Sequence, residues 1–260
     1  MLHAIMEPPR DEEIDMSVTL EVSGLNKRFG GIHAVKDCSF AIEDGTITSL
    51  IGPNGAGKTT TFNLINNVIS PDTGTVRFEG RDVTGKMPHK LTRLGIGRTF
   101  QVTRTLGDMT VLENMVVGSS DTKLRSMFGS RMLDNEIERA FELLEFVGIA
   151  EYAYTNAEAL SYGQRKLLEF SAVLMSEPQI VLLDEPAGGV NPALLKRMVG
   201  RIRELNEKGL SFFIVEHNMD LVMDLSDSVI VMAHGEVLLH GTPDEVQSDR
   251  RVLDAYLGKV

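Results

Sequence analysis

The sequence has little cysteine, few aromatic residues and no long apolar run. Of its 260 residues one is cysteine, none is tryptophan and 6 % are aromatic. The single cysteine, Cys38, excludes an internal disulfide and fits a reducing compartment, so we expect a buried structural thiol there. No stretch approaches the roughly 20 consecutive apolar residues of a membrane-spanning helix. The sequence therefore predicts neither a disulfide-stabilised nor a membrane-embedded chain.

Basic residues are also in deficit. The chain carries 26 Lys and Arg against 37 Asp and Glu, for a formal net charge of −11. That balance disfavours a nucleic acid or an anionic membrane surface as the main partner. It does not disfavour a nucleotide that is held by local backbone N–H groups and a metal ion. With 42 % hydrophobic residues, the chain can bury a substantial core in one large domain or two small ones.

One glycine-rich stretch has a specific chemical meaning. It follows the apolar run Ile47–Ile51 and precedes the helical run Thr61–Ile65. This strand–loop–helix context, with the spacing GxxxxGK[ST], is typical of a phosphate-binding P-loop, and the alternative is a chance glycine turn. The residues predicted to hold phosphate are Gly52, Pro53, Asn54, Gly55, Ala56, Gly57, Lys58, Thr59 and Thr60. Backbone N–H groups form the anion nest, Lys58 adds a charge, and the Thr59 hydroxyl is a candidate Mg²⁺ ligand.

Two acidic residues and a histidine follow later buried strands. Asp184 and Glu185 end the apolar run that starts at Gln179, and His217 follows the run Ser211–Val215. Beside a P-loop, Asp184 can hold Mg²⁺ and Glu185 can polarise an attacking water, whereas the alternative is an acidic strand end facing solvent. His217 can hydrogen-bond a terminal phosphate, although a lone histidine at a strand end is more often structural.

Three further positions allow two interpretations each. Phe29, in a turn over Lys27–Gly31, suits stacking on an adenine ring or packing in the core. Gln101 lies where the core meets a helical segment and can reach a metal or water, although taken alone it would be a surface residue. Ser161 opens a helix with an unobstructed glycine, Gly163, and forms either a simple helix cap or a second anion site that serves another copy.

Strands that alternate with helices predict an α/β chain with a mainly parallel sheet covered on both faces. We expect a disordered leader over residues 1–17, which is neither a signal peptide nor a targeting helix. Residues 18–101 and 171–241 are predicted to form the core, with an antiparallel β flap. Residues 102–170 are predicted to be a helical insertion, and residues 242–260 a helical tail.

Together these motifs resemble the ATPase subunits of ATP-binding-cassette (ABC) transporters over about Val18 to Gly258. The motifs that carry the resemblance are the Walker A loop Gly52–Thr60, the Walker B strand Ile180–Glu185, the Q-loop residue Gln101, the signature Leu160–Gln164, the switch histidine His217 and the adenine-stacking position Phe29. The resemblance implies a P-loop NTPase (RecA-like) core with a β flap and an all-helical insertion. It also implies ATP as substrate and Mg²⁺ as cofactor.

The resemblance assigns a task to each group of residues. Those implied to act in hydrolysis are Glu185, His217 and Gln101, those implied to hold Mg²⁺ are Thr59, Gln101 and Asp184, and those implied to contact the ATP of a second subunit are Ser161, Gly163 and Gln164. Two positions depart from the common pattern: Tyr162 stands where glycine is usual, and Asn191 stands where aspartate is usual.

A finer resemblance, carried by segments such as Arg98–Gln101 and Ala255–Gly258, points to the LivG-type ATPases of branched-chain amino acid importers. It implies transmembrane permeases and a second ATPase, identical or related, in a head-to-tail dimer. It also implies a cytoplasmic location at the membrane, with membrane association through the permeases and no nucleic acid partner. Residues 102–114 are candidates for permease contact. The alternatives are a urea or other amide importer, a non-transport ABC ATPase that acts on DNA or ribosomes, and a P-loop kinase.

Overall fold

The computed structural model describes residues 18–99, 105–118 and 134–257. The predicted leader over residues 1–17 and the candidate residue Gln101 lie outside these ranges, as do residues 102–104 of the candidate permease segment. Within the described ranges, no helix combines the length and the apolar character needed to cross a membrane.

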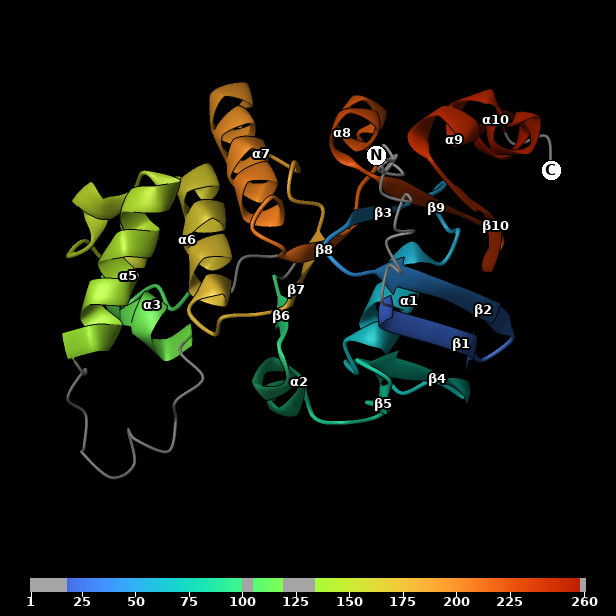
Figure 1. Cartoon of the computed structure of the whole chain (residues 1–260), viewed down its shortest axis with the longest axis horizontal. Helices are drawn as coiled ribbons and strands as arrows, with labels where there is room; N and C mark the ends of the chain where they lie inside the picture. The colour runs from blue at the N-terminus through green and yellow to red at the C-terminus, as the bar shows by residue number, and fades with distance from the viewer. Residues whose placement is uncertain (1–17, 100–104, 119–133, 258–260) are drawn as a thin grey trace, which may run out of the picture.

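A six-stranded sheet forms the centre of the molecule (Figure 1). Its strands, in spatial order, are β10 (Glu236–Gly241), β9 (Ser228–Ala233), β3 (Ile47–Ile51), β8 (Ser211–Val215), β7 (Ile180–Asp184) and β6 (Ile96–Arg98). All neighbours pair in parallel except β10, which is antiparallel to β9. The predicted mainly parallel α/β core is therefore confirmed. Because the strands are parallel, the carboxyl ends of β3, β8, β7 and β6 lie along one edge.

A second, antiparallel sheet covers one face of the first. It contains, in order, β2 (Ile32–Glu43), β1 (Val18–Phe29), β4 (Thr73–Phe78) and β5 (Arg81–Asp82). This sheet is the flap expected from the early strands. The predicted turn over Lys27–Gly31 is shorter than expected, because β1 runs on to Phe29 and only Gly30 and Gly31 form the turn.

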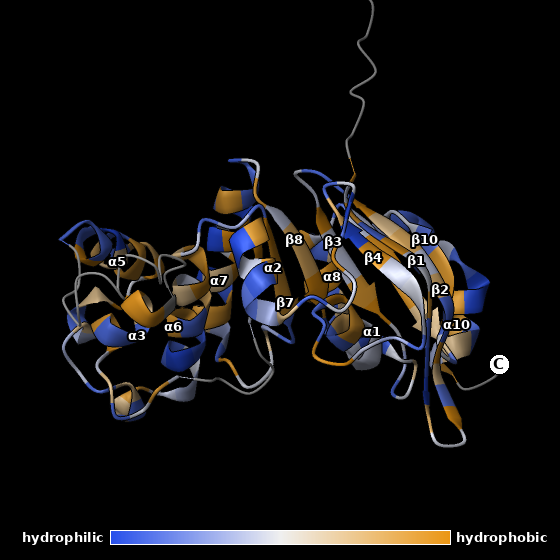
Figure 2. Cartoon of the chain, turned by 90° about the horizontal axis from the view of Figure 1, so that it is seen from below, coloured by the Kyte–Doolittle hydropathy of each residue, from blue (hydrophilic) through white to orange (hydrophobic). Residues whose placement is uncertain are grey.

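The central strands are apolar on both faces, which is the pattern of a parallel strand covered on each side (Figure 2). Strand β7 shows the alternation. Ile180 and Leu182 pack into the core that the flap covers, whereas Val181 and Leu183 pack into the core of the opposite face. The flap-side core also contains Cys38, whose burial raises its thiol pKa to about 12. The prediction of a buried, structural cysteine is confirmed.

Helices cover the remaining surfaces. Their bounds are α1 (Lys58–Ile65), α2 (Pro88–Leu94), α3 (Val111–Gly118), α5 (Asp134–Val147), α6 (Tyr162–Leu174), α7 (Pro192–Asn206), α8 (Met219–Leu225), α9 (Pro243–Ser248) and α10 (Arg250–Tyr256), with short 3₁₀ turns at Ala150–Tyr152 and Ala157–Ala159. The expected helical tail is divided into two helices, α9 and α10. The division is at Asp249, whose backbone is extended and whose side chain caps α10.

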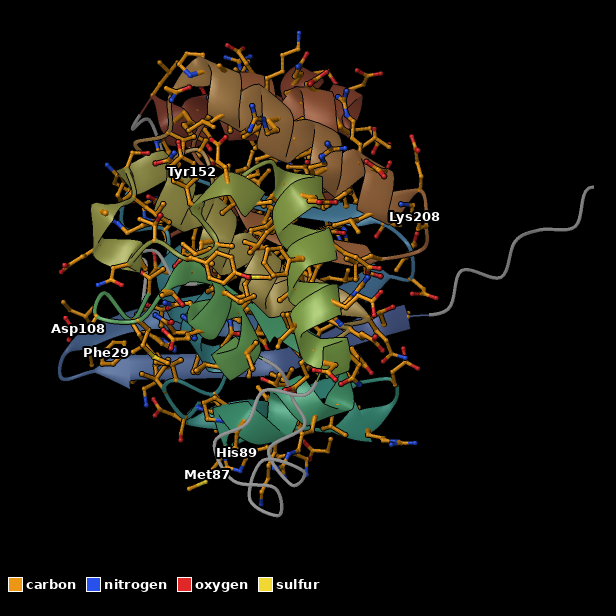
Figure 3. All side chains as sticks on the ribbon, turned by 90° about the vertical axis from the view of Figure 1, so that its left-hand side faces the viewer. Phe29, Met87, His89, Asp108, Tyr152 and Lys208 are labelled. Atoms are coloured by element: carbon orange, nitrogen blue, oxygen red, sulfur yellow. The ribbon has the colours of Figure 1, made fainter. Side chains whose placement is uncertain are left out.

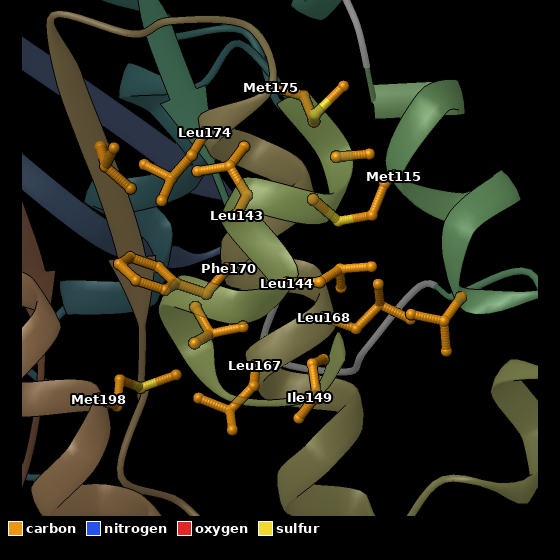
Figure 4. Close-up of a cluster of buried hydrophobic side chains, with 14 of the residues drawn as sticks. Met115, Leu143, Leu144, Ile149, Leu167, Leu168, Phe170, Leu174, Met175 and Met198 are labelled. Carbon is orange, nitrogen blue, oxygen red and sulfur yellow. The ribbon is translucent and has the colours of Figure 1, made fainter. Parts of the chain in front are cut away.

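Helices α3, α5 and α6 pack together at one end of the molecule (Figure 1). Their shared core includes Met115 of α3, Leu144 of α5 and Phe170 of α6, and it continues onto the sheet through α7 (Figure 4). Helix α6 reaches Leu174, beyond the boundary at residue 170 that the sequence predicted. The proposed domain limits themselves stay a prediction.

Phe213 of β8 joins the flap, the central sheet and the first helix. Its ring is fully buried, with its centroid 5.7 Å from that of Phe40 in β2 and 6.2 Å from that of Phe62 in α1. We expect Phe213→Ala to lower the free energy of unfolding by about 3–5 kcal/mol, because truncation leaves a cavity in a core that cannot collapse fully. Urea denaturation measures this change.

The control is Ile32→Ala at the flap surface, where the side chain is 71 % exposed. It is expected to change stability by less than about 0.5 kcal/mol. Equal losses in the two variants would show that Phe213 does not hold these layers together.

Candidate functional site

The predicted functional segments converge on the edge where the parallel strands end. The P-loop follows β3, Asp184 and Glu185 end β7, and His217 follows β8, which lies between those two strands. This edge is where ligands bind in open α/β sheets. The described residues of the candidate site therefore share one location in the fold.

The P-loop is packed too closely for side chains at two glycines. A Cβ on Gly52 would lie 2.1 Å from the carbonyl oxygen of Met232, and one on Gly57 would lie 2.5 Å from that of Ala34. Both have a positive φ, which glycine tolerates best. The loop is also fixed by the turn after β9, since the Gly235 N–H donates to the Ala56 carbonyl at 3.0 Å.

Lys58 begins α1 and lies over its own loop. Its Nζ donates to the carbonyl oxygens of Gly52, at 2.7 Å, and Pro53, at 3.1 Å. Burial lowers the pKa of Lys58, and the nearby Glu185 carboxylate opposes that shift. The lysine therefore lies between the P-loop and the acidic residue at the end of β7.

The C-terminal helix also reaches the P-loop. Burial raises the pKa of the Tyr256 hydroxyl, and the backbone N–H of Gly52 donates to it. The first glycine of the loop is thus held from the tail as well as from β9. Sequence analysis did not assign this contact, because it depends on how α10 folds back.

Asp184 and Glu185 lie in different environments. The Asp184 side chain is buried, and this burial, together with the neighbouring Glu185 charge, raises its pKa, while Arg98 and Lys166 lower it. Glu185 is partly open to solvent and its backbone has a φ of +48°. Its carboxylate lies 3.8 Å from Nδ1 of His217, whose side chain is largely exposed. The structure therefore brings Asp184, Glu185 and His217 together.

Glu216 is a residue that sequence analysis missed. It is buried between β8 and α8, and its Oε1 accepts from the Ala187 N–H at 2.8 Å. Its Oε2 accepts from the N–H groups of His217 and Asn218. Glu216 therefore ties the segment after Glu185 to the histidine segment. The available signal was an acid directly after a fully apolar strand.

Ser161 starts α6 in a capping box. Its Oγ accepts from the Gln164 N–H at 3.3 Å, and the Gln164 side chain accepts from the Ser161 N–H at 2.8 Å. Ser161 is exposed. The predicted cap is confirmed, while contact with a second subunit's nucleotide remains a proposal.

Gly163 is less open than its sequence context indicated. It is buried, and a Cβ there would lie 2.6 Å from Cδ1 of Leu194 in α7. A side chain at this position would displace the end of the Leu194 side chain where α6 packs against α7. The neighbouring departure at Asn191 also has a local explanation, since its side chain caps α7 through the Leu194 N–H at 3.0 Å. Asn is as good a helix cap as Asp.

Phe29 lies at the end of the flap hairpin, at the periphery of the molecule (Figure 3). It is 48 % exposed, so the alternative of a core phenylalanine is wrong. The Lys27 Nζ lies 5.6 Å from its ring centroid. Stacking on adenine stays a prediction.

The whole sequence is similar to named transport proteins. Residues 35–188 match the family described as "ABC transporter", and residues 236–260 match "Branched-chain amino acid ATP-binding cassette transporter". The probable branched-chain amino acid transport ATP-binding protein LivG of Archaeoglobus fulgidus is 40 % identical over 244 residues, covering 92 % of this chain and 95 % of the relative. BraF of Pseudomonas aeruginosa, a high-affinity branched-chain amino acid transport ATP-binding protein, is 39 % identical over 251 residues, covering 92 % and 98 %.

Solved structures are similar over the same span. One ATP-binding cassette of an ABC transporter, in its ADP conformation, has a TM-score of 0.83 at 35 % identity and covers 93 % of this chain and 99 % of that one. A nucleotide-free ATP-binding cassette has a TM-score of 0.82 at 34 % identity, covering 92 % and 99 %. The fold, the motifs and the sequence of this chain all match those of ATP-binding cassettes over most of its length. The chain therefore belongs to the ABC transporter family, as an ATP-binding cassette subunit.

Proposed function

We propose that this chain is the ATP-hydrolysing subunit of an importer for branched-chain amino acids. The observation that carries the proposal is the convergence of the P-loop, Asp184–Glu185 and His217 at one sheet edge, in a chain that resembles LivG and BraF over 92 % of its length. The C-terminal match to a branched-chain amino acid family supports the cargo. Urea or another amide remains the second candidate cargo.

In the proposed site, the phosphates of ATP lie against the P-loop and the start of α1. The backbone N–H groups of Gly57–Thr60 face the anion, because the first N–H groups of a helix have no partners within it. Lys58 exchanges its two loop carbonyls for phosphate oxygens, which a charged donor prefers. Phe29 stacks on the adenine from the flap.

The residues beside the phosphates fit a magnesium ion. Asp184 is a buried carboxylate whose pKa burial has raised, and a bound cation would favour its ionised form. Thr59 supplies a hydroxyl from the first turn of α1, and Gln101 is the third proposed ligand. Oxygen ligands of this kind suit Mg²⁺, which supplies charge neutralisation at the β- and γ-phosphates.

Glu185 then accepts a proton from the water that attacks the γ-phosphorus, and the products are ADP and inorganic phosphate. The carboxylate is partly open to solvent, which leaves it accessible to that water. His217 lies beside Glu185 and can donate to the γ-phosphate. Gln101 is proposed to orient the same water.

A second ATPase subunit, identical or related, completes the site in a head-to-tail pair. Ser161, Gly163 and Gln164 are proposed to contact the ATP held by the partner's P-loop. The proposal is supported by the exposed start of α6, whose first N–H groups and Ser161 hydroxyl form an anion-binding helix end.

Permeases are proposed to dock on the groove between the core and the helical unit. A cavity of about 260 Å³ lies there, and its lining includes Leu106 and Val117, each 47 % exposed, and Arg98 of β6. The groove is lined by part of the proposed contact segment at residues 102–114 and also by residues of α3 and α6, so the proposed contact surface includes these two helices. Docking there would place the chain at the inner face of the membrane, held through the permeases.

Replacing the proposed base tests the hydrolytic step. We expect Glu185→Gln to lower kcat for ATP by about 10²–10⁴-fold, because the amide cannot accept the proton, while ATP affinity is retained. Steady-state phosphate release and equilibrium ATP binding measure the two effects. Glu177→Gln is the control, because the φ of Glu177, +49°, is almost that of Glu185 and its side chain is exposed. Turnover at the wild-type rate in the Glu185 variant would remove this residue from catalysis.

Removing the Ser161 hydroxyl tests the contact between subunits. We expect Ser161→Ala to lower kcat at least tenfold, by the loss of a hydrogen bond to charged phosphate, with little change in ATP binding to the single chain. The matched control is Thr242→Ala, which removes the capping box of α9 in the same way. If both variants lose activity equally, the effect belongs to helix capping and the trans contact is refuted.

A charge in the groove tests permease docking. Leu106→Asp is expected to abolish co-purification with the permeases and leave basal ATPase activity unchanged, because an ionised carboxylate cannot be buried against an apolar partner. Ile32→Asp, on the flap, is the control. Intact co-purification of the Leu106 variant would place the docking surface elsewhere.

A further inference from the structure

Lys166 is a buried lysine to which none of the functions above assigns a task. It lies in the second turn of α6, the helix that Ser161 starts, and it is 6 % exposed. Lysine is almost never fully buried without a partner, because removing an ammonium group from water is costly. Its position therefore requires a specific compensation.

That compensation is the backbone of Glu185. The Lys166 Nζ donates to the Glu185 carbonyl oxygen at 2.5 Å and to the Pro186 carbonyl oxygen at 3.5 Å. The same Glu185 oxygen accepts from the Gly188 N–H at 3.1 Å. On the other side of the residue, the Glu185 N–H donates to the Val215 carbonyl at 2.9 Å.

These contacts hold a residue whose backbone is strained. Glu185 has a φ of +48°, a left-handed region that residues with a side chain rarely adopt. Such a conformation persists when the surroundings fix it. Lys166 contributes a side-chain hydrogen bond to the Glu185 carbonyl, and the donor comes from another helix.

Charges around Lys166 favour its ammonium form. The carboxylates of Glu169, Glu216, Glu185 and Asp184 all act to raise its pKa, against burial, which lowers it and is the largest effect. Lys166 and Arg98 in turn lower the pKa of Asp184. The lysine is thus a buried cation close to the two acids at the end of β7.

We propose that Lys166 is a positioning residue that holds the backbone of Glu185 in the left-handed conformation from which its carboxylate reaches the attacking water. The inference rests on the proposed function, because it presumes that Glu185 acts in ATP hydrolysis. The Lys166 ammonium group is directed at backbone carbonyl oxygens. It acts from α6, through the carbonyl of the residue whose side chain does the chemistry.

Two replacements separate its contributions. Lys166→Met keeps the side chain as far as Cε and removes the donor, whereas Lys166→Gln, whose nitrogen is one bond closer to the backbone, keeps an uncharged N–H donor. We expect the Met variant to lower kcat about 10²-fold, since small misplacement of a catalytic group costs this much, and to leave the Kd for ATP unchanged. The Gln variant is expected to recover part of the loss. Lys196→Met, on the exposed surface of α7, is the control.

The readouts are kcat, the Kd for ATP and the melting temperature of each purified full-length variant. A Met variant with wild-type kcat would overturn the inference, as would a fall in ATP affinity equal to the fall in kcat. Wild-type protein that fails to hydrolyse ATP would refute the proposed function instead.

Discussion

The backbone N–H groups at the start of α1 are the constraint on which the rest of this structure depends. They have no partners within their helix, and the glycines before them allow the loop to curve until these groups face one point. The surrounding chain holds that curve from several directions. Met232 and Gly235 at the end of β9, Ala34 in the flap and Tyr256 in the tail all lie against the loop.

The parallel sheet explains why the acids and the histidine reach the same place. Strands β3, β8 and β7 are neighbours and point the same way, so the residue after each strand arrives at the same edge. Glu216 then ties two of these ends together through backbone N–H groups. The ends of the strands therefore form one rigid frame, while the Glu185 and His217 side chains remain accessible to solvent.

Sequence predicted the parts of the molecule that local patterns control. The bounds expected for β3 and β8 agree with the structure, because each is a short and mainly apolar segment between clear turn signals. The α/β core, the flap and the family are also confirmed. The P-loop and the acids at the end of β7 were recognisable because their spacing itself carries the chemistry.

Other features depend on contacts between distant segments, which no local pattern reveals. Lys166 and Glu185 are far apart in the sequence, and only the packing of α6 beside β7 brings them together. The same holds for Gly163, which lies against Leu194 of α7, and for Tyr256 at Gly52. In each case the residue type was visible in the sequence, whereas the partner that explains it was not.

Helix α6 connects the two halves of the proposed mechanism. Its N-cap residue, Ser161, is the proposed contact with the partner's nucleotide. In its second turn, Lys166 holds the backbone of Glu185, which is proposed to act on the nucleotide of its own chain. A movement of this helix would therefore shift both Ser161 and the backbone of Glu185. This arrangement gives a physical route from the helical unit, where permeases are proposed to dock, to the chemistry at the sheet edge.

The central claim is that each nucleotide is shared between two chains, and mixing two inactive variants measures it directly. One variant, Lys58→Ala, has a damaged P-loop and an intact start of α6. The other variant, Ser161→Arg, has an intact P-loop and a damaged start of α6. Under conditions in which the wild-type chain alone hydrolyses ATP, the account predicts that the mixture regains activity, because a mixed pair contains one site with both parts intact. Activity of the mixture equal to the sum of the two separate variants would contradict it.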